Sequence, residues 1–260
     1  MVGSCVFFPA QAGAELSSPE YLSLDGTAVA SGNVLDGESI KTIASPVLRI
    51  YRTQSTPPRG TVLLFPGGGY RLLAMKWEGE KTADALMQKG FDVVILEYHV
   101  LDNPDVAALP ESGRMEKTRE LALEDALKAY RLLRTRGPEW NLHMDRLAVM
   151  GYSAGGHLAA RLAQHLTPAE LPSDLVLIYP AYLDKPLRSG GGREVVPPEK
   201  TGRLYVLFGD QDNAGWIRGC QDYVADWERA GGKATVVFLP GLGHGFGASK
   251  IEALNDFFRP

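Results

Sequence analysis

The chain has 260 residues, of which 45% are hydrophobic and 22% are charged, and its formal net charge is -4. This balance is typical of a globular protein with a sizeable core, and it offers no basic footprint for nucleic acid. No apolar run approaches the roughly 20 residues that a membrane-spanning helix needs. We therefore expect neither nucleic acid nor a membrane among its partners.

The N-terminal residues MVGSCVFFPAQAGAE contain a short apolar stretch followed by small residues. Because a basic n-region is missing, they favour a cytoplasmic chain over one with a signal peptide. A secreted or periplasmic protein is the alternative if this stretch is a trimmed signal peptide. Cys5 and Cys220 are too few for a disulfide framework, so each is expected to be a free thiol.

Strand-like runs alternate with helical patterns along the chain. Residues 45–53 alternate apolar and polar side chains, as an edge strand does. Continuous apolar runs predict six buried strands, at residues 60–70, 91–100, 146–152, 174–182, 203–210 and 234–241. Helical spacing of apolar residues predicts five helices, at residues 78–90, 115–137, 154–166, 215–232 and 249–258.

Buried strands separated by helices indicate an α/β fold, with a mostly parallel sheet covered by helices on both faces. We expect a single domain. Residues 1–44 would be an N-terminal segment, with possible first strands, packed on a main unit of residues 45–260. The polar, glycine-containing segments 101–114 and 183–200 are predicted to be surface loops.

Ser153 lies in GYSAGG, between a predicted strand and a predicted helix. A sharp strand-to-helix turn brings two backbone segments close together, which explains small residues at Gly151 and Gly155. The pattern G-x-S-x-G in this context is the nucleophile elbow, which exposes the serine hydroxyl near the positive end of a helix. A chance match in a glycine-rich chain is the alternative.

A serine hydroxyl needs a base to take its proton. His244, in the glycine-rich loop PGLGHGFG after the last predicted strand, is the favoured base because it follows the serine at the correct edge of the sheet. His99 also ends a strand at that edge and competes with it. The other histidines are expected to be structural: His143 precedes the elbow strand, and His157 and His165 lie along the helix after Ser153.

The acid of a triad should follow a strand between the serine and the histidine. Asp210 and Asp212 both follow the strand RLYVLFG. We favour Asp212, which lies further into the loop, and expect Asp210 to hold that loop by accepting backbone N–H groups. Asp184, after the preceding strand, is a third candidate.

Acyl transfer also needs donors for a tetrahedral oxyanion. The segment FPGGGY follows an early strand, and Gly67, Gly68 and Gly69 allow backbone N–H groups to approach a substrate. Ala154, directly after the serine, would supply another N–H. The segment matches neither phosphate-loop pattern. A purely structural glycine turn is the alternative.

Together these motifs resemble the α/β-hydrolase superfamily in its esterase/lipase branch. FPGGGYRLLAMKWEGEKTADALMQKGFDVVILEYHV and GYSAGGHLAA look like small bacterial carbohydrate esterases, of the acetyl-xylan-esterase-like or feruloyl-esterase-like kind. The resemblance implies an α/β-hydrolase catalytic domain that needs no metal or organic cofactor. It also implies site roles: Ser153 as nucleophile, Asp212 as acid, His244 as base, and Gly68, Gly69 and Ala154 as oxyanion donors.

The chain departs from part of the superfamily at Pro66, where many lipases and esterases have the histidine of H-G-G-G. Because the donors are backbone groups, this change leaves the oxyanion hole possible, but it weakens the analogy with hormone-sensitive lipases. The segment AMKWEGE also resembles the carbohydrate esterases. We expect its Glu78 to cap the first helix, with a place at the border of the site as the alternative.

In many relatives a cap domain follows the strand that corresponds to residues 174–182. Here residues 183–202 are too few to build a large lid, and an open site suits a small acyl group on a bulky alcohol. Four aromatic residues near strand ends are candidates to stack on sugar rings or line an acyl pocket, with ordinary packing as the alternative: Tyr70, Tyr152, Trp216 and Trp77.

The sequence thus predicts a serine esterase that acts through an acyl-enzyme on acetyl or feruloyl esters of carbohydrates. A small ester or an acylated oligosaccharide would be its partner, and the oligomeric state stays open. One alternative is a serine peptidase of the same fold, although no acidic cluster for a peptide N-terminus is evident. Another is a non-catalytic binding protein, which would usually have lost one of the three triad candidates.

Overall fold

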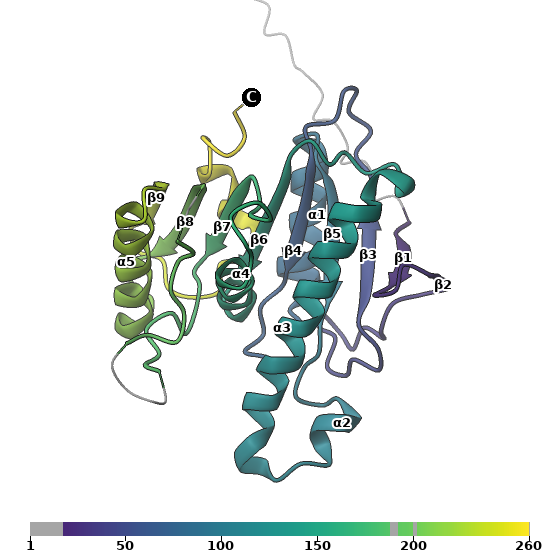
Figure 1. Cartoon of the computed structure of the whole chain (residues 1–260), viewed down its shortest axis with the longest axis horizontal. Coiled ribbons are helices and arrows are strands. Elements are labelled where there is room, and N and C mark those ends of the chain that lie inside the picture. The colour runs from purple at the N-terminus through teal and green to yellow at the C-terminus, as the bar shows by residue number, and fades with distance from the viewer. Residues whose placement is uncertain (1–17, 188–191, 200–201, 260) are drawn as a thin grey trace, which may run out of the picture.

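A single twisted sheet runs through the molecule, and helices pack on both of its faces (Figure 1). The computed structural model describes residues 18–187, 192–199 and 202–259. The strand order in the sheet is β2-β1-β3-β5-β4-β6-β7-β8-β9. The strands are β1 (Glu20–Ser23), β2 (Ala28–Val29), β3 (Val47–Tyr51), β4 (Thr61–Phe65), β5 (Asp92–Glu97), β6 (Leu147–Tyr152), β7 (Asp174–Ile178), β8 (Arg203–Gly209) and β9 (Lys233–Leu239).

From β5 to β9 all neighbouring strands are parallel, whereas β1, β2 and β3 add antiparallel pairs at one side. The strands β4 to β7 are buried along their whole length, as expected for a parallel sheet covered on both faces. The last strand, β9, has no buried residue because it forms an edge of the sheet, so the prediction of a buried strand at residues 234–241 is correct for the strand but wrong for its burial. These observations confirm the predicted α/β fold and its mostly parallel sheet.

The helices connect successive parallel strands. They are α1 (Lys81–Gln88), α2 (Pro104–Ala107), α3 (Glu111–Arg136), α4 (Ala154–Gln164) and α5 (Ala214–Arg229), with a π-helical turn η1 (Met75–Glu80) and the 3₁₀ segments η2 (Gly137–Trp140) and η3 (Gly247–Ala253). Helices α3 and α4 pack side by side in front of the sheet, and α1 lies behind it, packed with η3 (Figure 1). Among the described residues, no helix has the length and apolarity that a membrane crossing requires.

The prediction that residues 45–53 form an edge strand is wrong. Strand β3 is buried throughout and pairs with β5 on one side and with β1 on the other. The apparent polar position, Arg49, is 6% exposed and forms ion pairs with Glu97 and Glu80, at N···O distances of 2.7 and 2.9 Å. A charge in the middle of a strand therefore indicated a buried ion pair rather than a solvent-facing side.

Several other predicted boundaries change, including the helix predicted at residues 78–90, of which only Lys81–Gln88 form α1. The predicted loop 101–114 contains α2 and the first turn of α3, which begins at Glu111 rather than at Met115. The predicted helix 249–258 is a 3₁₀ segment that begins at Gly247 and ends at Ala253, followed by turns. In the predicted loop 183–200, Pro186 and Arg193 form an isolated antiparallel bridge. The prediction for Cys5 lies outside the described residues, whereas Cys220 is a free, buried thiol.

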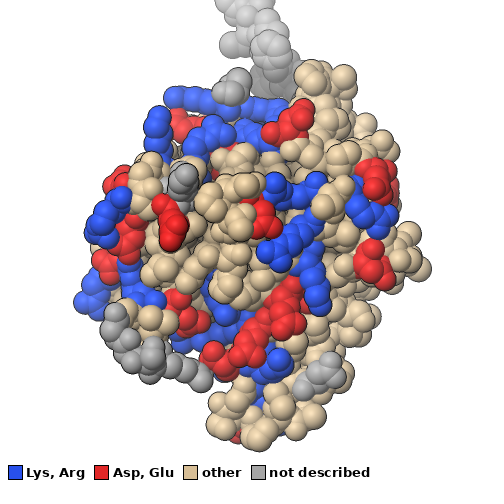
Figure 2. Space-filling view, in the orientation of Figure 1, with Lys and Arg blue, Asp and Glu red and all other residues tan. Residues whose placement is uncertain are grey.

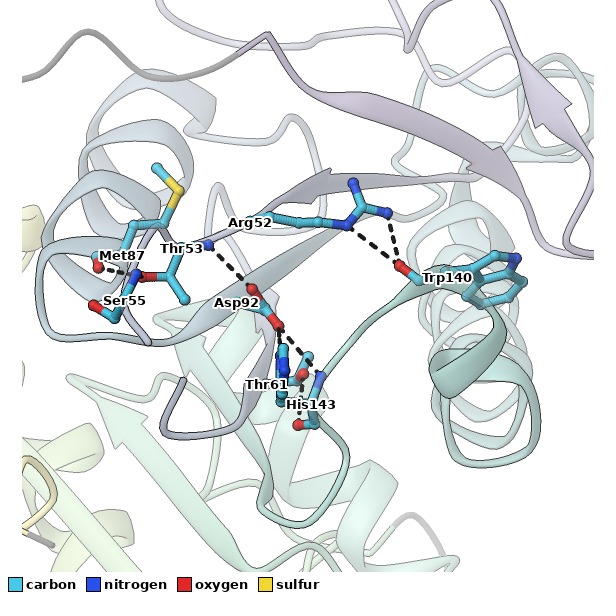
Figure 3. A network of polar contacts seen from close by, with 8 residues as sticks. All are labelled: Arg52, Thr53, Ser55, Thr61, Met87, Asp92, Trp140 and His143. Carbon is cyan, nitrogen blue, oxygen red and sulfur yellow. Dashed lines mark hydrogen bonds and ion pairs between the residues drawn. The ribbon is translucent and has the colours of Figure 1, made fainter. Parts of the chain in front are cut away.

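At the amino ends of the strands, Asp92 ties three segments together (Figure 3). Its carboxylate accepts hydrogen bonds from the His143 ring nitrogen Nδ1 at 2.8 Å and from the Thr53 N–H at 3.0 Å. The Thr61 hydroxyl donates to the backbone carbonyl of His143, at 2.9 Å, and not to its ring. This histidine–aspartate pair is therefore structural and lies at the edge of the sheet opposite to Ser153.

On the face shown in Figure 2, basic and acidic side chains are interspersed.

Candidate active site

Ser153 stands in the turn between β6 and α4, at φ 49° and ψ −116°. This left-handed region costs an ordinary residue free energy, so the surrounding packing must hold it. The Ser153 N–H donates to the Ile178 carbonyl at 3.0 Å, and the Ser153 carbonyl accepts from Ala181 at 3.1 Å. The turn is thus fastened to the segment that follows β7.

The glycines on either side of Ser153 permit the close approach of this turn to its neighbours. A Cβ atom added to Gly151 would collide with the Gly155 carbonyl oxygen, and one added to Gly155 would collide with the carbonyl oxygen of Phe65 in β4. Backbone atoms cannot move away as a flexible side chain can. The G-x-S-x-G pattern is therefore a packing requirement of the elbow in this structure.

Ser153, His244 and Asp212 come together at the carboxyl ends of the strands. Ser153 Oγ lies 2.7 Å from His244 Nε2, and His244 Nδ1 lies 2.8 Å from Asp212 Oδ2. The Asp212 side chain is 3% exposed, while that of His244 is 29% exposed. A carboxylate at Nδ1 holds the proton on that nitrogen, so Nε2 is left to accept the serine proton.

The two aspartates of the loop after β8 have different partners. Asp210 Oδ1 accepts the Gly241 N–H at 2.6 Å, and Asp212 accepts the neighbouring Asn213 N–H at 2.6 Å in addition to its contact with His244. Asp210 thus ties its loop to the segment before His244, as the sequence predicted. Of the two, only Asp212 contacts the histidine.

The remaining histidine candidates are engaged elsewhere. His99 Nδ1 lies 2.6 Å from Asp125 Oδ2 of α3, so this histidine is paired with a carboxylate away from Ser153. His165 Nδ1 donates to the Arg161 carbonyl at 2.8 Å. His157 is fully buried within α4, and burial lowers the pKa of its imidazole well below the usual value.

The glycine-rich segment after β4 lies against the elbow. A Cβ added to Gly67 would stand 2.8 Å from the Ser153 Cβ, so this loop runs directly beside the serine. The Gly67 N–H donates to Glu78 at 2.6 Å. By contrast, the N–H groups of Gly68, Gly69 and Ala154 donate to no other group of the described chain. These three groups are the ones that the sequence singled out as oxyanion donors.

Glu78 lies at the border of the site and does not cap the first helix, which corrects the favoured interpretation of the sequence. It is 7% exposed, its Oε2 accepts from Gly67, and its Oε1 accepts from the Tyr179 hydroxyl at 2.7 Å. Burial raises the pKa of the Glu78 carboxyl, against the hydrogen bonds from Tyr179 and Gly67 and the nearby charge of His244, which lower it.

Tyr179, which no sequence motif singled out, continues this network to the histidine loop. Its hydroxyl accepts the Gly247 N–H at 3.0 Å, and its ring centroid lies 4.9 Å from that of His244. Burial, followed by the charge of Glu78, raises its pKa. One chain of hydrogen bonds thus joins the glycine-rich loop beside Ser153 to the loop that carries His244. Its place one residue after β7 was the available signal for this role.

The same architecture occurs in known proteins. A family model described as alpha/beta hydrolase fold matches residues 115–206. Esterase 2 of Thermogutta terrifontis, phosphoramylated by tabun, superposes with a TM-score of 0.66 at 18% identity, covering 95% of this chain and 96% of that chain. The chain has the α/β-hydrolase fold.

Two curated relatives match part of this chain. An acetylxylan esterase of Xylanibacter ruminicola is 29% identical over 125 residues, which are 47% of this chain and 23% of that protein. Endo-1,4-beta-xylanase B of Butyrivibrio fibrisolvens is 30% identical over 120 residues, which are 46% of this chain and 17% of that protein. The match thus spans less than a quarter of the length of either relative.

The aromatic residues that the sequence proposed as substrate contacts lie in different environments in this α/β-hydrolase fold. Tyr70 and Tyr152 are fully buried, and their hydroxyls bond His157 and Thr82, each at 2.8 Å. The prediction that these two tyrosines contact substrate is therefore wrong. Trp216 is half-buried with its ring centroid 4.6 Å from that of His244, so it remains a candidate.

Tyr182 and Trp216 form an aromatic wall beside the triad, with ring centroids 5.6 Å apart. A Cβ on Gly69 would lie 3.7 Å from the Tyr182 hydroxyl, so the wall reaches the glycine-rich loop. The sequence pattern did not single out Tyr182.

In the described part of the chain, no group of three or more His, Cys, Asp or Glu side chains is placed to hold a metal ion.

Proposed function

We propose that the protein is a serine carboxylic-ester hydrolase that cleaves short-acyl esters of carbohydrates, such as acetyl or feruloyl esters. The observation that carries the proposal is the pair of contacts through which Ser153, His244 and Asp212 are linked, at 2.7 and 2.8 Å. A hydroxyl, an imidazole and a carboxylate linked in this order form the triad that activates a serine nucleophile. The fold provides the matching elbow and a donor-rich loop beside it.

In this proposal Ser153 Oγ attacks the ester carbonyl carbon while its proton passes to His244 Nε2. The carbonyl oxygen becomes an oxyanion, which accepts from the N–H groups of Gly68, Gly69 and Ala154. When the tetrahedral adduct collapses, the bond to the alcohol oxygen breaks and His244 protonates the leaving alcohol. A water molecule then attacks the acyl-enzyme with His244 as base again, which releases the acid and restores Ser153.

The carbohydrate part of the proposal is supported by the two partial relatives, whose names refer to acetylxylan and xylan. The short connection between β7 and β8 supports an open site, because it carries no large lid among its described residues. An open site accommodates a bulky alcohol and leaves only a small acyl group to be enclosed.

The direct test of the nucleophile is covalent labelling. We expect a p-nitrophenyl organophosphate such as paraoxon to phosphorylate Ser153 with release of one nitrophenolate, because the hydroxyl is activated by His244. Peptide mass spectrometry would locate the added group. A His244→Ala variant serves as the control and should label much more slowly. Folded protein that takes up no label at Ser153 would contradict the proposal.

The rate at which each ester releases its acid measures the substrate class. Acetylated xylo-oligosaccharides, feruloylated sugars and p-nitrophenyl esters of short and long acids should be compared by kcat/KM. We expect the short-acyl esters to be preferred over the long ones. Preferential cleavage of an aminoacyl anilide would instead identify a serine peptidase.

Glu78 is expected to position the glycine-rich loop and the loop that carries His244. Replacing it by Gln leaves an amide that can accept on one side only, so either Gly67 or Tyr179 loses its acceptor. Leaving a buried donor unpaired costs about 1–3 kcal/mol, and we expect kcat to fall by about 10- to 100-fold with little change in KM. Steady-state kinetics on p-nitrophenyl acetate would measure both constants.

Glu80→Gln provides the matched control for Glu78→Gln. Glu80 belongs to the same turn, η1, but its carboxylate pairs with Arg49 at 2.9 Å, away from the triad. Its replacement should affect stability more than kcat. If Glu78→Gln lowered the melting temperature while kcat of the folded enzyme stayed at the wild-type value, Glu78 would be structural only.

A further inference from the structure

A groove of about 720 Å³ opens on the side of the molecule where η1 and α1 meet the loop after His244. Its lining includes Trp77, Lys81 and Asp84 from one side and Phe246 and Ser249 from the other. The mechanism proposed above uses none of these five side chains. The groove therefore needs an explanation of its own.

Both walls of the groove are continuous with the triad region. On one side, Trp77 directly precedes Glu78, which is bonded to the glycine-rich loop beside Ser153. On the other, Phe246 comes two residues after His244, and its ring centroid lies 4.5 Å from that of Tyr179. A Cβ on Gly247 would meet the Trp77 carbonyl oxygen at 3.3 Å, so the two walls touch.

Trp77 offers a large, ordered and accessible aromatic surface in this groove. The residue is 47% exposed, although most of a tryptophan side chain is usually buried. Its indole N–H donates to Glu38 at 2.6 Å, and Lys81 Nζ lies 3.3 Å from its ring centroid. Both contacts fix the ring in place, so little conformational entropy remains to be lost when a ligand packs on it.

Apart from the contact of the Lys81 ammonium with the Trp77 ring, the charged groups of the groove are available to a ligand. Within the described residues, neither the Lys81 ammonium nor the Asp84 carboxylate has a hydrogen-bond or ion-pair partner of its own. An ammonium donates and a carboxylate accepts, so together they match a ligand that presents several hydroxyl groups. They do not match an acyl chain, which would leave both charges without compensation.

We propose that this groove is a binding subsite for a sugar ring of the alcohol part of the substrate. This inference rests on the proposed ester hydrolysis and deepens it. A pyranose ring has an apolar face of C–H groups that packs on the exposed part of the Trp77 ring that Lys81 leaves uncovered, and hydroxyl groups at its edge that reach Lys81 and Asp84. Phe246 closes the opposite wall, so the neighbouring sugar is held while its acylated partner reaches Ser153.

The test compares two esters with the same acyl group and different alcohols. For wild type and Trp77→Ala, kcat/KM is measured on an acetylated xylotriose and on p-nitrophenyl acetate. We expect the ratio of the two values to fall about tenfold in Trp77→Ala, since a lost stacking contact is of the size that changes affinity by this factor. The loss should lie mainly in KM for the xylotriose ester.

Trp140→Ala is the matched control. Trp140 is also partly exposed, with Arg136 5.1 Å from its ring centroid, but it precedes β6 and lies at the opposite edge of the sheet. This variant should keep the wild-type ratio of kcat/KM on the xylotriose ester to kcat/KM on p-nitrophenyl acetate.

A binding measurement tests the subsite without catalysis. In Ser153→Ala protein, the affinity for deacetylated xylotriose, measured by calorimetry, should weaken when Trp77→Ala is added.

The two proposals fail in different ways. If wild type hydrolyses p-nitrophenyl acetate but Trp77→Ala keeps the wild-type ratio, the subsite is refuted while the esterase proposal stands. If wild type hydrolyses neither ester, the proposed function itself fails. An equal loss on both esters, with normal folding by circular dichroism, would make Trp77 a support of the triad and would also refute the subsite.

Discussion

Replacing Ser153 by Ala is expected to lower kcat for p-nitrophenyl acetate by at least about 10⁴-fold, because the reaction then has no covalent route. His244 and the glycine-rich loop remain in place, so any residual rate would come from water activated by the same surroundings. Initial rates at saturating substrate would measure the loss, and circular dichroism would show whether the fold is kept.

Ser55→Ala is the control for this experiment, because Ser55 precedes β4, far from the elbow at the carboxyl ends of the strands. It should retain wild-type turnover. A Ser153→Ala protein that hydrolyses the ester at a tenth of the wild-type rate or faster would show that the nucleophile lies elsewhere.

Asp212→Asn is expected to lower kcat by about 10³- to 10⁴-fold, since an amide in place of the carboxylate no longer holds the His244 proton on Nδ1. The imidazole then carries its proton on the nitrogen that faces Ser153, and it cannot act as a base there. Steady-state kinetics at neutral pH would measure the loss. The KM should change less than kcat, because the substrate does not contact Asp212 in the proposed mechanism.

Asp210→Asn separates the two neighbouring acids. The amide oxygen of Asn can still accept the Gly241 N–H, so the loop is held and kcat should fall by less than about tenfold. Equal losses in the two variants would mean that loop geometry decides the rate. A larger fall in kcat for Asp210→Asn than for Asp212→Asn would identify Asp210 as the triad acid.

The elements that could be predicted from the sequence are those whose signals are local. A continuous apolar run followed by G-x-S-x-G and a helical pattern specifies β6, the elbow and α4, because strand burial and glycine packing are both visible in one stretch. His244 and Asp212 were placed by their position after strands, since parallel strands bring their carboxyl ends to one edge of the sheet. The structure then shows the contacts between them.

What could not be predicted depends on partners that are distant in the chain. Arg49 resembled a solvent-facing position because its partner Glu97 is contributed by another strand. Tyr152 ends the elbow strand, but the direction of its side chain depends on helix α1, where the Thr82 hydroxyl donates a hydrogen bond to the Tyr152 hydroxyl. Glu78 looked like a helix cap because neither Gly67 nor Tyr179 adjoins it in sequence.

Trp77 and Glu78 are consecutive in one turn, yet the first is about half exposed and the second is buried against the glycine-rich loop. In the proposed reaction, adjacent codons therefore govern two separable properties, the recognition of the alcohol by Trp77 and the alignment of the reacting groups by Glu78. Laboratory evolution of the proposed esterase activity toward new acylated alcohols should accordingly find productive changes at position 77 and almost none at position 78.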